Sequence, residues 1–254
     1  MLTPFWVALQ LLTRLPVPAH VFDGQSLRDA PLWFPLVGAV LGLLLWSAYA
    51  LLAPWLPEGL ARTAVLALGV ALTGALHLDG LCDATDGLFG GRDRDGVLRI
   101  MRDPHAGAIG TVCVIVVLLL KQSALLALPA GQLGGSLVLA CVAGRSLMLA
   151  ALMLPPARSD GLGHAAAQPR SALRGLVCGA GVCAPALAWL GTGALAPMAL
   201  GVAASGALLH IAWRALGGVT GDICGAAGEL GETGFLIGTA GLLAAGAPTV
   251  GGLA

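Results

Sequence analysis

The stretch Trp33–Pro54, WFPLVGAVLGLLLWSAYALLAP, runs without a single charged residue. An α-helix rises about 1.5 Å per residue, so about 20 apolar residues cross the ~30 Å hydrocarbon core of a bilayer. The stretch meets that length, and it predicts a membrane-spanning helix.

The rest of the chain has the same character, with 57% hydrophobic and only 10% charged residues and a mean hydropathy of +0.90. Soluble domains contain about 45–50% apolar residues. We therefore predict an all-α, polytopic integral membrane protein with about seven transmembrane helices in one domain, residues 1–254. The further expected spans are Leu60–Leu78, Gly107–Pro129, Leu133–Pro155, Leu173–Leu190, Leu195–Leu216 and Phe235–Leu253.

The N-terminus begins with a short apolar run, Phe5–Leu12, followed by Arg14 and two prolines. The run is too short to span a bilayer, and it lacks the basic region and cleavage site of a signal peptide. We expect a short interfacial or re-entrant helix here.

Basic residues indicate the orientation of the chain. Seven spans place the N-terminus and three polar loops, at about 79–106, 156–172 and 217–234, on one side, while the other side holds Arg62 and Glu58. By the positive-inside rule the first side is cytoplasmic. The lipid bilayer is thus an expected partner, and a net charge of zero gives no reason to expect nucleic acid. The arginines on the first side are Arg14, Arg28, Arg92, Arg94, Arg99, Arg102, Arg158, Arg170, Arg174 and Arg214.

The first of these loops contains an unusual concentration of acids, HLDGLCDATDGLFGGRDRDGVLRIMR (His77–Arg102). Asp79, Asp83 and Asp86 stand at i, i+4 and i+7, so in a helix they share one face. Three carboxylates on one face repel each other unless a cation lies among them, and Mg2+ prefers such oxygen ligands together with substrate phosphates. The pattern predicts a metal and phosphate site, although Asp and Gly are also common in solvated turns.

A second acidic segment follows on the same side, GGVTGDICGAAGELGETG (217–234), in which Asp222 and Glu229 are again i and i+7. Arginines near such acids favour an anionic, diphosphate-containing substrate, although they also satisfy the topology rule. The candidate substrate-binding residues of the intervening loops are Arg102, Asp103, His105 and Arg158.

Among the ionisable residues within or at the ends of predicted spans, three need separate consideration. Lys121 and Arg145 are costly in lipid, so each is expected to pair with an acid or to line a cavity. We assign Arg145 to substrate binding and leave Lys121 open. His77, one turn before the aspartates, is a candidate substrate contact, although a structural histidine fits the position equally well. The six cysteines contain no CxxC pair, so neither zinc nor disulfides are expected.

Four of these stretches carry a family resemblance: FPLVGAVLG (Phe34–Gly42), the acidic block from His77 to Gly110, Arg145, and GGVTGDICGAAGEL (Gly217–Leu230). Together, in this order, they resemble the cobalamin 5'-phosphate synthase family, also called adenosylcobinamide-GDP ribazoletransferase. Cys82 stands where the family commonly has a small residue such as Ala.

The resemblance implies a Mg2+-dependent enzyme of the bacterial inner membrane that completes the cobamide nucleotide loop. Its substrates are adenosylcobinamide-GDP and alpha-ribazole or alpha-ribazole 5'-phosphate, and GMP is released. One or two metal ions at the diphosphate suit this chemistry, and one acid takes the proton of the attacking hydroxyl. The candidate metal and catalytic residues are Asp79, Asp83, Asp86, Asp222 and Glu229.

Two other functions remain open at this stage. DATDG resembles the start of the CDP-alcohol phosphotransferase pattern, but Gly90 and Gly91 stand where Ala and Arg are required, and Arg99 replaces the final Asp. An ion-coupled transporter is less favoured, because transporters place ionisable residues near the bilayer midplane and are built from repeated halves. The sequence leaves homo-oligomerisation open.

Overall fold

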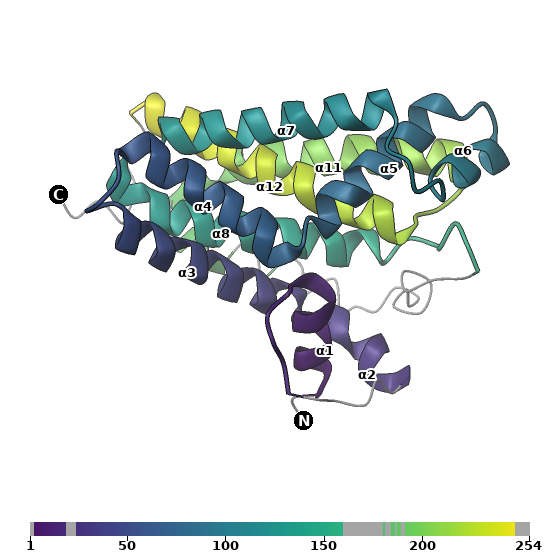
Figure 1. Ribbon diagram of the computed structural model, residues 1–254, viewed down its shortest axis with the longest axis horizontal. Helices are drawn as coiled ribbons and strands as arrows, with labels where there is room; N and C mark the ends of the chain where they lie inside the picture. The colour runs from purple at the N-terminus through teal and green to yellow at the C-terminus, as the bar shows by residue number, and fades with distance from the viewer. Residues whose placement is uncertain are drawn as a thin grey trace.

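The structure is a computed structural model, and it describes residues 3–18, 24–159, 180, 184–185, 187–188 and 191–246. Figure 1 shows a bundle of long helices with a smaller N-terminal arm beside it. The helices are α1 (Thr3–Leu12), α2 (Gly24–Asp29), η1 (Ala30–Trp33), α3 (Phe34–Leu52), α4 (Glu58–Thr73), α5 (Leu76–Gly90), α6 (Arg94–Ile100), α7 (Ala108–Ala127), α8 (Ala130–Ala151), η2 (Gly191–Ala194), α11 (Leu195–Leu216) and α12 (Gly221–Ala244).

Within this described part, four helical stretches are long and apolar enough to cross a membrane, and a bent pair brings the number to five. The four contain α3, α7, α8 and α11, and they coincide with predicted spans. The all-α membrane architecture is confirmed. The predicted span Leu173–Leu190 lies outside the described residues, apart from positions 180, 184–185 and 187–188.

Large apolar side chains are exposed along the outer faces of these helices, for example Trp46 on α3, Leu119 on α7 and Val202 on α11. A soluble protein rarely exposes apolar surface on this scale. Such exposure is typical of membrane-spanning helices, because a bilayer gives no reason to bury apolar side chains.

The predicted span Leu60–Leu78 is interrupted in the structure. α4 ends at Thr73, and Gly74 and Ala75 both adopt left-handed backbone conformations, with φ of 61° and 58°. α5 leaves this break at 82° to α4. The N–H of Arg14 donates to the carbonyl of Leu72 at 2.6 Å, so the segment after α1 is fastened to the bend.

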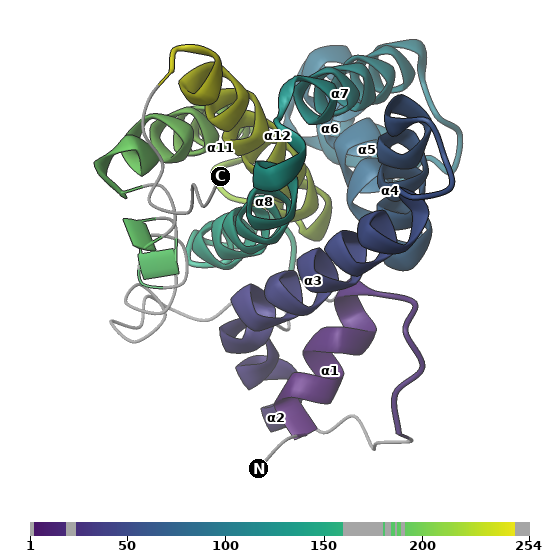
Figure 2. The ribbon, with the colours of Figure 1, turned by 90° about the vertical axis from the view of Figure 1, so that its left-hand side faces the viewer.

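The stretch at 217–234 is not the loop that the sequence predicts, because α12 begins at Gly221 and continues without a break to Ala244. The Thr220 side chain accepts a hydrogen bond from the Ile223 N–H at 3.3 Å and caps the helix, as threonine commonly does. In Figure 2, α12 lies among α11, α8, α7 and α5, all of which it contacts. The second acidic segment is therefore part of the central helix.

Glycines explain how closely these helices approach. A Cβ added at Gly144 of α8 would lie 2.9 Å from the Gly228 carbonyl of α12, and one added at Gly234 would lie 2.9 Å from the Leu200 carbonyl of α11. Small residues at such contacts allow backbones to pack directly against each other. Gly228 and Gly234, within the stretch 217–234, are therefore helix-packing positions.

Candidate active site

The two acidic segments meet where α5 packs against α12. A Cβ added at Gly80 would lie 2.9 Å from the carbonyl oxygen of Asp222, so this contact depends on the missing side chain. Asp79, Asp83 and Asp86 project from α5, and the charges of Asp79, Asp86 and Asp222 all act on Asp83. We refer to Asp79, Asp83, Asp86 and Asp222 as the acidic ridge.

Asp86 also has a structural function. One oxygen of its carboxylate accepts a hydrogen bond from the Gly107 N–H at 2.7 Å, and the other accepts one from the Gly110 N–H at 2.9 Å. The first N–H groups of a helix have no partner within the helix. Asp86 thus caps α7 from a neighbouring helix and fixes the start of α7 beside the ridge.

Arg158 reaches the ridge through a short parallel pairing of backbone. The Ala157 N–H donates to the Val219 carbonyl at 2.8 Å, and the Val219 N–H donates to the Pro155 carbonyl at 2.9 Å. This pairing brings Arg158 to Asp222, whose carboxylate accepts a hydrogen bond from Arg158 Nη2 at 2.8 Å. Arg158 therefore lies beside the ridge, and arginine is a favoured partner of phosphate groups.

Arg94 supports the same region. Its guanidinium donates to the Ala157 carbonyl at 2.5 Å and to the Leu216 carbonyl at 3.3 Å. α6 is in this way joined to the end of α11 and to the segment that carries Arg158. The sequence alone gives this arginine no role other than topology.

Arg102, Asp103 and His105 lie exposed on the connection between α6 and α7. The Asp103 carboxylate contacts the His105 backbone N–H at 3.0 Å and the His105 Nδ1 at 2.7 Å. These hydrogen bonds lower the pKa of Asp103. Because the connection ends at Gly107, which binds Asp86, it borders the acidic ridge.

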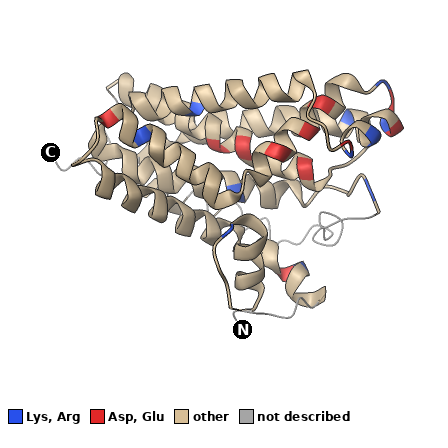
Figure 3. Cartoon of the chain, in the orientation of Figure 1, with Lys and Arg blue, Asp and Glu red and all other residues tan. Residues whose placement is uncertain are grey.

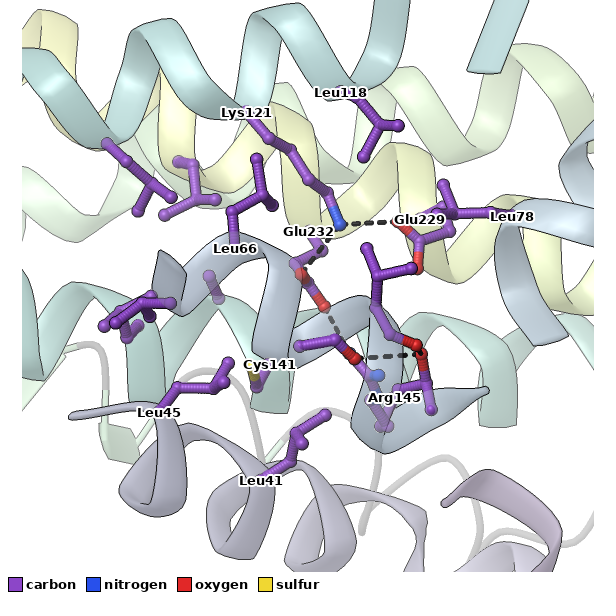
Figure 4. A pocket seen from close by; sticks show the side chains of 18 residues that line it. Leu41, Leu45, Leu66, Leu78, Leu118, Lys121, Cys141, Arg145, Glu229 and Glu232 are labelled. Atoms are coloured by element: carbon purple, nitrogen blue, oxygen red, sulfur yellow. Dashed lines mark hydrogen bonds and ion pairs between the residues drawn. The ribbon is translucent and has the colours of Figure 1, made fainter. Parts of the chain in front are cut away.

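A second group of charges lies inside the bundle (Figure 4). Lys121 Nζ donates to Glu229 at 2.5 Å and to Glu232 at 2.8 Å, and Arg145 donates to the other oxygen of Glu232. His77 Nδ1 lies 3.9 Å from Glu229. These five residues form the buried charge cluster, which joins α5, α7, α8 and α12.

Apart from Arg102, Asp103 and His105, which lie on the connection between α6 and α7, the predicted site residues lie in two places. Asp79, Asp83, Asp86, Asp222 and Arg158 meet at the ridge, whereas His77, Arg145 and Glu229 lie in the buried charge cluster. Glu229 follows Asp222 by seven residues, about 10 Å along a helix, whereas Mg2+ holds its ligands at about 2.1 Å. In this conformation Glu229 binds Lys121 and Asp222 binds Arg158, so the two acids do not meet at one point.

No three His, Cys, Asp or Glu side chains in the described parts of the chain are already arranged to hold a metal ion. Asp79 and Asp83 are nevertheless carboxylates without a hydrogen-bond partner among those residues. Their oxygens are hard donors of the kind that Mg2+ selects. The ridge therefore offers carboxylate ligands for a metal ion, and the phosphate of a substrate can supply the remaining oxygen ligands.

Glu232 is the functional candidate that the sequence reasoning missed. It shares one cluster with Lys121 and Arg145, which are 111 and 87 residues away. A signal was present, because two basic residues inside predicted spans require acids at the same depth. As long as 217–234 is predicted to be a loop, the sequence does not identify these acids.

Comparison with known proteins agrees with the resemblance seen in the sequence. A family model described as cobalamin-5-phosphate synthase matches residues 4–240. No solved structure matches the chain.

Three relatives described as adenosylcobinamide-GDP ribazoletransferase are similar over almost their whole length. The Pseudomonas putida protein is 44% identical over 246 residues, which cover 93% of this chain and 98% of that protein. The Pseudomonas entomophila protein is 43% identical with the same coverage, and the Stutzerimonas stutzeri protein is 43% identical over 244 residues, 93% and 97% of the two chains. The chain described here therefore belongs to the cobalamin-5-phosphate synthase family.

Proposed function

We propose that this protein is an adenosylcobinamide-GDP ribazoletransferase whose active site is the acidic ridge. It joins adenosylcobinamide-GDP to alpha-ribazole, or to alpha-ribazole 5'-phosphate, and releases GMP. Family membership and the names of the relatives support the reaction. The observation that carries the assignment to the ridge is the meeting of Asp79 and Asp83 with Asp222 and Arg158 at the α5–α12 contact.

A divalent metal fits this donor set. Asp79, Asp83 and Asp222 present carboxylate oxygens at the ridge, and we propose these three as the residues that hold Mg2+, with Asp86 adjacent to them. When bound, Mg2+ neutralises the diphosphate and the phosphate that leaves as GMP.

The residues of the chain supply orientation and proton transfer. A hydroxyl oxygen of alpha-ribazole forms a bond to the phosphorus that carries cobinamide, and the bond from that phosphorus to the oxygen of GMP breaks. The hydroxyl proton passes to a ridge carboxylate, and Asp83, which is central and half-buried, has one oxygen for the metal and a second for this proton. The Arg158 guanidinium, which now binds Asp222, can donate to a phosphate oxygen in the same position.

Exposed residues at the border of the ridge complete the proposed substrate site. Arg102 and His105 are exposed on the connection that ends at Gly107, whose N–H binds Asp86, and a large corrinoid or a nucleotide can reach them there. Asp103 holds His105 in place through two contacts.

We propose that the ridge faces the cytoplasm from the bacterial inner membrane. Figure 3 shows Lys, Arg, Asp and Glu gathered toward the end of the bundle that carries α5 and α6. The positive-inside rule associates such an end with the cytoplasm, where the nucleotide substrate is available.

The reaction is tested with purified protein in lipid nanodiscs, supplied with adenosylcobinamide-GDP, alpha-ribazole and Mg2+. We expect equal amounts of cobamide product and GMP by liquid chromatography and mass spectrometry, and loss of both when EDTA replaces Mg2+. CDP-alcohol with an alcohol acceptor is the comparison substrate pair. Turnover of that pair, without turnover of the cobinamide substrate, would contradict the proposal.

A further inference from the structure

The buried charge cluster lies deep among the helices. The side chains of Lys121 and Arg145 are 6% and 4% exposed, and those of Glu229 and Glu232 are 7% and 14% exposed. Two cations and two carboxylates balance each other when His77 is neutral. Buried ion pairs are weak evidence for stability, because desolvation opposes their attraction, and their best-attested use is to specify one arrangement of helices.

The cluster is too enclosed to hold the reacting groups. The cavity that Lys121, Arg145, Glu229 and Glu232 line has a volume of about 40 Å3 and is otherwise lined mainly by apolar side chains. A buried water needs about 10–15 Å3 on this measure, so the cavity accommodates about three waters. A diphosphate ester or a corrinoid does not fit. The cluster residues therefore act on the reaction through other parts of the protein.

The geometry of α12 supplies the connection to the ridge. Glu229 follows Asp222 by two helical turns, so both residues lie on the same face of α12. Lys121 and Arg145 hold α12 from α7 and α8, and His77 lies against Gly225 and near Glu229 from α5. A rotation of α12 that breaks these ion pairs also turns Asp222 away from Asp79 and Asp83.

We propose that Lys121, Arg145 and Glu232 are positioning residues for ribazole transfer, and that their ion pairs fix the rotation of α12 that aligns Asp222 with Asp79 and Asp83. This positioning role rests on the proposed function of the ridge. The predicted contact of Arg145 with substrate is replaced by an indirect role, because its guanidinium is engaged by Glu232 within the bundle.

The kinetic test compares Glu232→Gln with the charge-balanced double variant Lys121→Met/Glu232→Gln. We expect the single variant to lower kcat roughly ten- to hundred-fold with KM for adenosylcobinamide-GDP within about three-fold, because small misplacement of reacting groups affects the chemical step. The double variant restores charge balance and folded yield but remains slow. Lys121→Arg, which keeps the charge, retains more kcat than Lys121→Met.

Glu58→Gln is the matched control, because Glu58 also pairs with a buried arginine, Arg62, but on α4 away from the ridge. We expect it to leave kcat unchanged. Any of three results would overturn the positioning role: wild-type kcat per folded molecule in Glu232→Gln, recovery of kcat in the double variant, or a rise in KM alone.

A second readout is independent of catalysis. Spin labels are attached to cysteines at Phe89 on α5 and Gly221 on α12, both exposed, in a background without the native cysteines, and the distance between them is measured by pulsed electron resonance. We expect Glu232→Gln to shift or broaden the distance distribution and Glu58→Gln to leave it unchanged. An unchanged distance distribution in Glu232→Gln overturns the inference, even if the protein catalyses a different reaction. Inactivity of the wild type, by contrast, contradicts only the proposed function.

Discussion

Asp83→Asn is expected to lower kcat for cobamide formation at least about 1000-fold, the largest effect of any single substitution at the ridge. Asp83 is the member on which the charges of Asp79, Asp86, Asp222 and Arg158 all act. The amide keeps the shape of the side chain but removes an anionic metal ligand and a proton acceptor, and general-base catalysis alone contributes about 10²- to 10⁴-fold. The rate of GMP release by saturated enzyme in nanodiscs measures the effect.

The same substitution is expected to leave the melting temperature unchanged or slightly raised. The Asp83 carboxylate has no hydrogen-bond partner among the described residues, and removal of its charge relieves repulsion among carboxylates, as often happens when active-site strain is removed. Asp95→Asn is the matched control, since Asp95 belongs to the same acidic stretch but its side chain is 91% exposed. Retention of more than a tenth of wild-type kcat by Asp83→Asn contradicts a central role for this residue.

Gly42→Leu is expected to destabilise the fold more than any change at the site. A Cβ at Gly42 would lie 2.5 Å from the Val138 Cα and 3.1 Å from the Leu137 carbonyl of α8, and backbone atoms cannot move aside as a flexible side chain can. Overpacking costs about 1–3 kcal/mol or more, and 3 kcal/mol corresponds to roughly 6–12 °C in a chain of this size. Thermal unfolding in detergent, followed by tryptophan fluorescence, measures the shift.

Gly206→Leu provides the control for this prediction. Gly206 lies on exposed surface of α11, and a Cβ there meets nothing within 4 Å among the described residues. The same added side chain should therefore leave the melting temperature within a few degrees of wild type. Equal effects of the two substitutions would show that the α3–α8 contact does not depend on Gly42.

The membrane architecture follows from local sequence because bilayer thickness sets helix length. The boundaries of α3, α7, α8 and α11 agree with long, mainly apolar stretches. The bend between α4 and α5 was not predicted, because it depends on a left-handed Ala75 and on the contact of Arg14 with Leu72, which lie almost sixty residues apart.

The start of α12 shows a second limit of sequence reasoning. The prediction of a polar loop at 217–234 rests on the placement of the expected spans, and the glycines of the segment, Gly221, Gly225, Gly228, Gly231 and Gly234, give no local support for a helix because they lower helix propensity in water. In the bundle, Gly225, Gly228, Gly231 and Gly234 allow contacts with α5, α8 and α11, and tertiary packing outweighs propensity. Thr220 and Asp222, as cap and first-turn acid, were the local signals for a helix.

Sequence spacing found the acidic ridge more reliably than it found the roles of single residues. The i, i+4, i+7 pattern identified Asp79, Asp83 and Asp86 as one face, and the second segment supplied Asp222. The same i, i+7 rule added Glu229, which the structure places with Lys121 instead. Helical spacing shows which residues share one face of a helix. It does not show which neighbouring residues that face contacts two turns further along.

The central claim is that the acidic ridge is a metal-binding active site. Its most direct test is the binding of Mn2+, which replaces Mg2+ in oxygen-ligand sites. The protein is saturated with adenosylcobinamide-GDP without alpha-ribazole, and loss of the free Mn2+ electron resonance signal is followed for wild type, Asp83→Asn and Asp95→Asn. We predict saturable binding to wild type and Asp95→Asn, and binding at least about ten-fold weaker in Asp83→Asn, since carboxylates and substrate phosphates together form the site. Equal Mn2+ affinity of Asp83→Asn and wild type contradicts the account.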